Sequence, residues 1–414
     1  MKPHFLLAAG VILTACGGHD ATSPNGANSN AFTHRLSANA GTSLSGFFGN
    51  YLPAVPQVTL TDLTGHPLAG IQVTFAAGGG GSVVGSTSMT DSSGHAQPRS
   101  WRLGPAGAQS VTATAAGAAP LAFTAQASAP PPGTFHIEVR YAANTTPTPA
   151  QQAAFDAAAA RWSTLILQGG PPVTIQEFDS GCGDLRGQTV DGLVITAELS
   201  PIDGAGKILG SAGPCILRDQ GYLPVQGYMQ FDTADLATLE AAGQLDQVIL
   251  HEMGHVLGFG TIWEVNPGAG FAPNMFLVRS LVDPVFTGGS AVEALLGTTG
   301  SLNFSGAGVP VEATGGAGTA YAHWREATFN NELMTGWLNP GTANPISAVT
   351  VDQFRDLGYV VNDALADGYS FAAMIQAAGG SGQPIALTEG TLTMPLIVVN
   401  RGGHEVGRVS RLLR

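Results

Sequence analysis

The stretch HEMGHVLGFGTIW, residues 251–263, decides how the fold of this chain is interpreted. Two histidines stand four residues apart, and a glutamate follows the first of them. On a helix, side chains four residues apart lie on one face, so His251 and His255 can direct ring nitrogens at a single metal ion. Glu252 is rotated away from that pair, where its carboxylate can accept a proton from a water on the metal. The stretch therefore predicts a zinc site on a helix, with a general base beside it.

We expect this helix over residues 236–257, and two glycines bear on its end and on its packing. Gly258 is placed to end it, because glycine readily adopts the left-handed conformation found after a helix C-terminus. Gly254 lies inside the helix and costs about 1 kcal/mol of helix propensity relative to alanine. A helix selected for stability alone would not keep it, so we expect another segment to pack closely against Gly254.

A catalytic zinc site takes three protein ligands, and this stretch supplies only two. One known motif continues as H-E-x-x-H-x-x-G-x-x-H, in which the glycine lets the chain turn back toward the metal. Gly258 stands at the glycine position, but Thr261 occupies the position of the third histidine. The third ligand must therefore come from further along the chain.

Two histidines lie downstream, His323 and His404. His323 is followed eleven residues later by Met334, within ELMTG, and a methionine turn beneath the metal accompanies such sites. His404 has no methionine after it. A carboxylate is a further possible ligand, and Glu326 and Glu332 are the candidates. We expect His323 to be the third ligand, with His404 and a carboxylate as alternatives.

Residues 134–361 resemble leishmanolysin, the surface-protease family of the metzincins, through HEMGHVLGF, AHWRE, ELMTG and FRDLGY. In that family a long insertion separates the glycine turn from the third histidine. The resemblance implies one catalytic zinc ion held by His251, His255 and His323. It also implies that Glu252 is the general base and Met334 the methionine-turn residue. The implied function is a zinc endopeptidase whose substrates are proteins or peptides, built on an α+β metzincin-type domain with a mixed sheet and an active-site helix.

The resemblance carries three further expectations. The insertion, residues 260–321, is expected to form a flap beside the cleft. The segment GYMQFD, residues 227–232, is expected to be either an edge strand that pairs with an extended substrate or an ordinary strand of the sheet. Latency through a thiol on the zinc is not expected, because the chain has no spare cysteine.

The N-terminus has the pattern of an export signal. Lys2 precedes the apolar run FLLAAGVIL, residues 5–13, which is too short to span a bilayer. The run leads into LTAC, which resembles a bacterial lipobox and implies removal of residues 1–15 and lipidation of Cys16. A plain secretion signal with an incidental cysteine is the alternative. We expect an exported lipoprotein on the outer membrane or cell surface, and a disulfide between the remaining Cys182 and Cys215.

A polar tether over residues 16–36 leads into an all-β segment, residues 37–128. Alternating apolar and polar residues predict strands at residues 57–62, 71–75, 109–115 and 121–127. The segments DLTGHPLAGIQVTF, GGGGSV, TDSSGHA and SVTATAAG, in this order, resemble a bacterial immunoglobulin-like domain of the invasin/intimin type. We expect a β-sandwich that acts as a spacer, with a specific adhesin as the alternative.

The remaining chain completes a multidomain architecture. Residues 129–133 form a Pro-rich linker, residues 134–361 the zinc peptidase domain, and residues 362–414 a β-rich extension of unassigned function. Further strands are expected at residues 135–141, 191–199 and 225–232. A helix is expected to begin at Thr148 and Pro149, with Gln151 completing a capping box.

Composition limits the function classes. The net charge is −13 and only 11% of residues are charged, so no basic surface is available to bind nucleic acid. The 44% of hydrophobic residues favours folded domains. Two functions remain: a membrane-tethered zinc endopeptidase, or a surface adhesin whose zinc domain is degenerate or structural. Glu252 favours the enzyme, because a structural zinc site needs no base and is closed by a fourth ligand.

Overall fold

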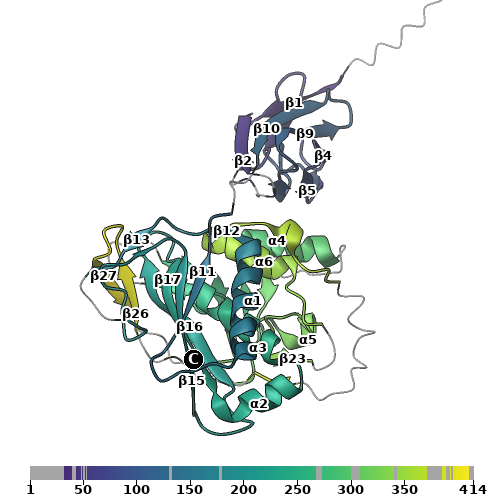
Figure 1. Cartoon of the computed structure of the whole chain (residues 1–414). Helices are drawn as coiled ribbons and strands as arrows, with labels where there is room; N and C mark the ends of the chain where they lie inside the picture. Colours follow the sequence, from purple (N-terminus) through teal and green to yellow (C-terminus); the bar gives the residue numbers. More distant parts are fainter. Residues whose placement is uncertain are drawn as a thin grey trace, which may run out of the picture.

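The computed structural model describes residues 32–39, 43–47, 49, 52, 54–129, 133–176, 180–266, 273–299, 308–316, 318–339, 343–370, 385–387, 392 and 395–409. Figure 1 shows a smaller all-β part near the N-terminus and a larger part that combines helices with sheets. Cys16 and the export signal lie outside the described residues.

The all-β part contains two main sheets around one hydrophobic core. The first sheet has the order β1 (His34–Ala38), β3 (Val58–Asp62), β7 (His95–Ala96). The second has the order β2 (Ser43–Phe47), β10 (Leu121–Ser128), β9 (Gly107–Ala115), β4 (Gln72–Gly78), β6 (Thr87–Met89), and β5 (Ser82–Val84) pairs separately with β8 (Ser100–Arg102). The alternating segments therefore form strands where the pattern predicts them, as β3, β4, β9 and β10. Their inward side chains, including Leu60, Phe75, Val111 and Phe123, share one buried cluster with Trp101 of β8.

The larger part is organised around a six-stranded mixed sheet. Its order is β11 (Ile137–Tyr141), β15 (Leu193–Ser200), β17 (Pro224–Asp232), β16 (Gly210–Arg218), β26 (Leu396–Val399), β27 (Glu405–Val409). Strands β11, β15 and β17 run parallel to one another, and β16 is antiparallel to β17. The C-terminal strands β26 and β27 extend this same sheet beyond β16.

The segment GYMQFD is an ordinary strand of the sheet, and the expectation that it forms an edge strand is wrong. It belongs to β17, which has β15 on one side and β16 on the other. Its backbone hydrogen bonds are therefore directed at neighbouring strands rather than at a substrate. A Cβ added to Gly227 in this strand would lie 2.1 Å from Val256 Cγ1 of the helix that packs on the sheet.

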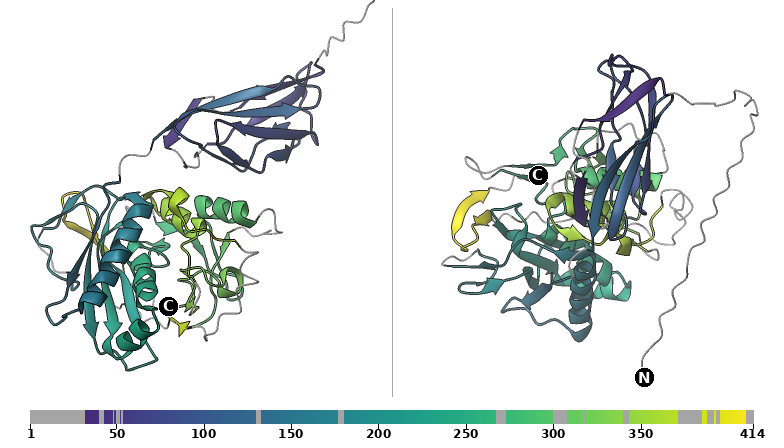
Figure 2. Two further views of the ribbon diagram at one scale, coloured as in Figure 1. Left: turned by 45° about the vertical axis from the view of Figure 1, so that its right-hand side comes forward. Right: turned by 90° about the horizontal axis from the view of Figure 1, so that it is seen from above.

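Two helices cover one face of the sheet, as Figure 2 shows. They are α1 (Pro149–Leu165) and α3 (Leu245–Leu257), joined where Trp162 Nε1 donates to Leu250 O at 2.9 Å. The predicted capping box of α1 is present. Gln151 N donates to Thr148 Oγ1 at 3.2 Å, and Thr148 N donates to Gln151 Oε1 at 2.9 Å.

The helix expected over residues 236–257 is divided in two. Helix α2 (Thr233–Ala241) begins behind Asp232, whose side chain accepts a hydrogen bond from Ala234 N. The chain then turns at Gly243, which has a φ of 63°, and α3 begins at Leu245. A residue in the left-handed conformation interrupts the helical hydrogen bonds, and this accounts for the break.

Most of the chain after α3 forms a second lobe of the larger part. It contains α4 (Gly289–Thr299), α5 (Glu326–Phe329), α6 (Ala348–Leu357) and a 3-10 turn, η1 (Asp363–Leu365). Its short strands are β18 (Glu264–Val265), β19 (Asn274–Met275), β20 (Leu277–Val278), β21 (Val285–Phe286), β22 (Val309–Pro310), β23 (Trp337–Leu338) and β25 (Ile385–Ala386). Strands β12 (Ile166–Gln168) and β24 (Val360–Val361) pair, as do β13 (Val173–Thr174) and β14 (Thr189–Val190). The described part of the 260–321 insertion contributes to the core through α4, which packs on α6, so it is more than a surface flap.

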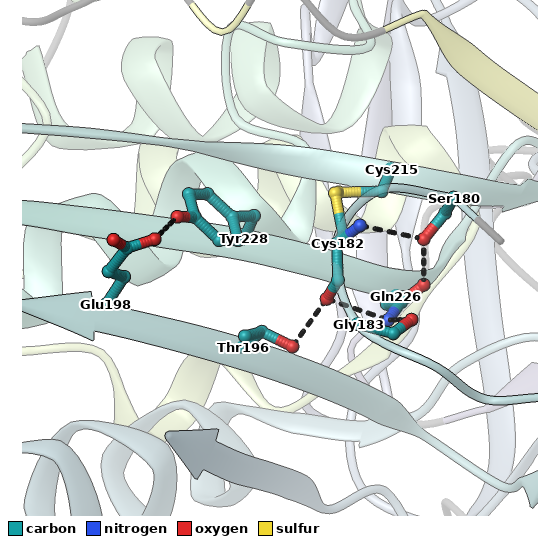
Figure 3. Close-up of a disulfide and its surroundings, with 8 residues drawn as sticks. All are labelled: Ser180, Cys182, Gly183, Thr196, Glu198, Cys215, Gln226 and Tyr228. Carbon is teal, nitrogen blue, oxygen red and sulfur yellow. Dashed lines mark hydrogen bonds between the residues drawn. A yellow bond between two sulfur atoms is a disulfide. The ribbon is translucent and has the colours of Figure 1, made fainter. Parts of the chain in front are cut away.

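The predicted disulfide joins Cys182 and Cys215, 33 residues apart, and both side chains are buried. Figure 3 shows the disulfide, which links the segment between β13 and β14 to β16. Both cysteines belong to a buried cluster separate from the one that contains the α3 side chains. Cys182 O accepts hydrogen bonds from Thr196 Oγ1 at 2.5 Å and Gln226 Nε2 at 3.0 Å.

Ion pairs join the all-β part to the second lobe, and Figure 1 shows the all-β part above the end of the larger part that carries α4 and α6. Arg99 Nε donates to Glu293 Oε1 of α4 at 2.8 Å. Arg102 pairs with Asp363 of η1, which also contacts Arg355 of α6. None of the helices in the described part of the chain combines the length and apolar character that a membrane span requires.

Candidate metal centre

Three histidine rings meet above the sheet. His251 and His255 lie on α3, and His323 lies in the segment that precedes α5. The Nε2 atoms are separated by 3.0 Å between His251 and His255, and by 3.1 Å from each of them to His323. All three side chains have zero exposure, and the ring nitrogens form a group with metal-binding spacing. A position just outside the plane of the three nitrogens lies about 2.0–2.1 Å from each, which is the Zn–N bond length. The residues present therefore fit a zinc ion.

The other nitrogen of each ring faces a backbone carbonyl. His251 Nδ1 lies 2.7 Å from Leu333 O, and His323 Nδ1 lies 2.9 Å from Thr319 O. His255 Nδ1 lies 2.9 Å from Phe259 O. A carbonyl oxygen can only accept, so each Nδ1 carries a proton, and in the neutral ring each Nε2 then keeps its lone pair. Such second contacts are the usual way in which ligand histidines are oriented toward a metal.

Gly254 and Met334 meet on the inner side of α3. A Cβ added to Gly254 would lie 2.9 Å from both Cε and Sδ of Met334, and 3.3 Å from Cζ2 of Trp162. Met334 and Trp162 are fully buried. The close packing predicted from the glycine is thus present, and the packing segment is the one that carries Met334. Glu252, on the same turn of α3 as His251, is 1% exposed.

The chain after α3 is shaped to bring His323 close. Gly258 ends the helix with a φ of 117°, as predicted. Gly260 has a φ of 68°, and a Cβ there would lie 2.2 Å from Ala322 O. Thr261 Oγ1 donates to His255 O at 2.7 Å, so it closes the helix end instead of facing the metal position. Gly260 was not among the predicted site residues, although the pair of glycines around Phe259 was visible in the sequence.

The alternative ligands lie elsewhere in the described part of the chain. His404 is exposed in the turn between β26 and β27, and the group of metal-binding spacing contains neither it nor a carboxylate. Burial raises the pKa of Glu326 to about 7, opposed by a hydrogen bond from Thr335 and reinforced by the charge of Glu312. Glu332 is fully buried, and burial raises its pKa while hydrogen bonds, first among them that from Thr350, oppose the rise.

Comparison with known proteins adds one family. The leishmanolysin family profile matches residues 186–379, just under half of the chain, and this supports metallopeptidase activity. No curated protein matches the chain. Solved structures with similarity include the D00-D0 domain of intimin (20% identity, 21% of this chain and 45% of that one, TM-score 0.17). The Escherichia coli adhesin FdeC is 15% identical over 24% of this chain and 31% of that one, with a TM-score of 0.19. Parabacteroides merdae beta-glucuronidase is 17% identical over 23% of this chain and 12% of that one, with a TM-score of 0.18. The chain spans less than half of each, and at these TM-scores the similarities bear on neither fold nor function.

Proposed function

We propose that this chain is a leishmanolysin-like zinc endopeptidase in which His251, His255 and His323 hold one zinc ion. The observation that carries the proposal is the convergence of three Nε2 lone pairs within 3.1 Å inside a buried site. Desolvated acceptors that face one another are unfavourable unless a cation lies between them. The family profile match spans all three histidines.

The residues around this centre suit peptide hydrolysis. A bound zinc ion supplies Lewis acidity toward a carbonyl oxygen and toward water. Glu252 follows His251 directly and is rotated from it by about 100° around the helix, which sets its carboxylate beside the ligand face. Its proposed role is to accept a proton from the attacking water and to pass that proton to the leaving amine. Met334 packs beneath α3 at Gly254, and we propose that it supports the ligand helix as the methionine-turn residue.

The placement of the protein is a second part of the proposal. We infer export and lipidation at Cys16 from the lipobox-like LTAC, and the disulfide is consistent with an oxidising compartment. Residues 37–128 would serve as an immunoglobulin-like spacer between that anchor and the peptidase domain of residues 134–361. The two sheets around one core support the spacer. Replacing Cys16 with serine should release the protein from membrane fractions, and unchanged fractionation would locate the anchor elsewhere.

The enzyme is tested by metal analysis and by digestion of casein or peptides. Wild type should bind one equivalent of zinc and cleave the substrate. Glu252→Gln should keep the zinc and lose activity by a factor of about 100 or more, the usual contribution of a general base. His323→Ala should lose zinc and activity together, and the matched control His404→Ala should lose neither. Zinc binding by wild type without any cleavage would instead favour a surface-binding protein with a structural zinc site.

A further inference from the structure

Glu332 is a fully buried carboxylate that is not part of the histidine group. Its Oε1 accepts hydrogen bonds from Ser347 N at 2.9 Å, Ser347 Oγ at 2.8 Å and Thr350 Oγ1 at 2.5 Å. Its Oε2 accepts from Met334 N at 2.6 Å. Four donors thus surround one carboxylate that has no contact with water. These contacts oppose the rise in the pKa of Glu332 that its burial causes, and they hold the side chain in a single orientation.

These donors come from two parts of the second lobe. Ser347 is the N-cap of α6, and Thr350 lies in its first turn. Thr350 Oγ1 also accepts a hydrogen bond from Trp324 Nε1 at 2.8 Å. Trp324 directly follows His323, and its backbone N donates to Met334 O at 3.0 Å. The carboxylate therefore connects the start of α6 with the segments that carry His323 and Met334.

The connection to the metal site runs through one peptide group. The N–H of Met334 and the C=O of Leu333 belong to the same peptide plane, which is rigid. Glu332 Oε2 binds the N–H end, and Leu333 O accepts from His251 Nδ1 at 2.7 Å. Rotation of this plane would break the hydrogen bond from Met334 N to Glu332, and it would tilt the imidazole of His251 at the same time.

We propose that Glu332 is a positioning residue of the metal centre, which fixes the Leu333–Met334 peptide plane and through it the His251 ring. This inference rests on the proposed zinc site. Glutamine at position 332 is nearly isosteric but has one acceptor oxygen and one NH2 group. If its oxygen faces Ser347 and Thr350, the NH2 group confronts the N–H of Met334. The substitution therefore removes the contact to the peptide plane with little change in volume.

Asp356 provides a matched control. It is a partly buried carboxylate that accepts hydrogen bonds from Ser290 N at 2.8 Å and Ala291 N at 3.0 Å, at the start of α4. None of these three residues belongs to the histidine group. Asp356→Asn should lower fold stability through loss of a partly buried acceptor, as Glu332→Gln should, but it should leave the metal centre unchanged.

The experiment measures zinc affinity by chelator competition on the full chain, and the absorption spectrum of the cobalt-substituted protein. Glu332→Gln should weaken zinc binding about 10–100-fold and change the cobalt spectrum, as loss of outer contacts to ligands does elsewhere. The zinc affinity of Asp356→Asn should stay within about 2-fold of wild type, a change well below the one expected for Glu332→Gln. If Glu332→Gln does not fold, Glu332→Asp, which keeps the charge but has a shorter reach, is measured under the same criteria.

Equal zinc affinity in Glu332→Gln and Asp356→Asn, with an unchanged cobalt spectrum, would overturn the proposal. Wild type that binds zinc but cleaves no peptide would refute the proposed enzyme and leave this comparison of affinities valid. Wild type that binds no zinc would overturn both.

Discussion

Replacing Gly254 with alanine should destabilise the protein, although the substitution improves the intrinsic propensity of α3. The propensity gain is about 1 kcal/mol in a helix interior. The new Cβ would lie 2.9 Å from two atoms of Met334 and 3.3 Å from Trp162, and both side chains are fully buried. Trp162 is also held by its hydrogen bond to Leu250 O. Overpacking of this kind costs about 1–3 kcal/mol, so the net destabilisation should be about 0–2 kcal/mol.

Gly297 in α4 is the control for this prediction. It is exposed, and a Cβ at this position would have no heavy atom within 4 Å. Gly297→Ala should therefore show the propensity gain alone and stabilise by about 0.5–1 kcal/mol. Both variants are compared with wild type by urea unfolding at one zinc concentration, because bound metal contributes to stability. Gly254→Ala should also weaken zinc binding, since α3 can relieve the contact only by moving.

A double substitution isolates the contribution to stability of the contact between residues 254 and 334. Met334→Ala alone should cost about 2–5 kcal/mol, as truncation of a buried methionine does. When Gly254→Ala is combined with Met334→Ala, the introduced Cβ occupies part of the vacated space, so the total loss should be smaller than the sum of the single losses. If Gly254→Ala stabilises the protein as much as Gly297→Ala and leaves zinc binding unchanged, the packing argument is refuted.

Three other predictions concern regions outside the metal centre. Replacing both Cys182 and Cys215 with alanine should lower the free energy of unfolding by about 3–4 kcal/mol, as urea unfolding would show, and no change would mean that the bond is absent in solution. The folded-state pKa of Glu326 is raised to about 7, so wild type loses stability as pH rises from about 4.5 to about 7. Glu326→Gln should remove this loss, and its advantage over wild type in urea unfolding should be larger near pH 8 than near pH 5; an advantage independent of pH would contradict this. Arg99→Ala removes the contact to Glu293 and should make residues 129–133 more sensitive to limited proteolysis, whereas equal cleavage rates would show that the ion pair does not hold the two parts together.

Features encoded over a few residues were predictable from the sequence. The capping box of α1 needs only Thr148, Pro149 and Gln151, and the end of α3 needs only Gly258. The histidine pair is set by helix periodicity, which places residues four apart on one face. His323 required a longer argument, in which a methionine eleven residues downstream separated it from His404. In each case the deciding signal is a residue type at a fixed offset.

Sheet order was not predictable in this way. Alternation shows which side chains of GYMQFD face the core, but it contains no information about which strands lie on either side. That order depends on pairings between strands far apart in the sequence, such as β11 with β15 and β16 with the C-terminal β26. The break at Gly243 is a different case. A single glycine within an apolar pattern is compatible with a continuous helix, and only the φ of 63° at Gly243 distinguishes two helices from one.

The candidate metal centre is specified as much by missing side chains as by its three histidines. At Gly254 the absence of a Cβ admits Met334, and at Gly260 it admits the backbone of Ala322, the neighbour of His323. Gly254 weakens the helix that contains it, so the stability of α3 does not explain it. Gly260 has a φ of 68°, a backbone conformation that favours glycine, and a Cβ there would also meet the backbone of Ala322. Both are explained if the segment from residue 322 to residue 334 must approach α3 at backbone distance. The same approach sets Leu333 O within 2.7 Å of His251 Nδ1 and brings His323 Nε2 within 3.1 Å of the other two rings. A chain that needed only a stable helix would have alanine at position 254; a chain that must assemble three imidazoles from segments some seventy residues apart has to leave this space open.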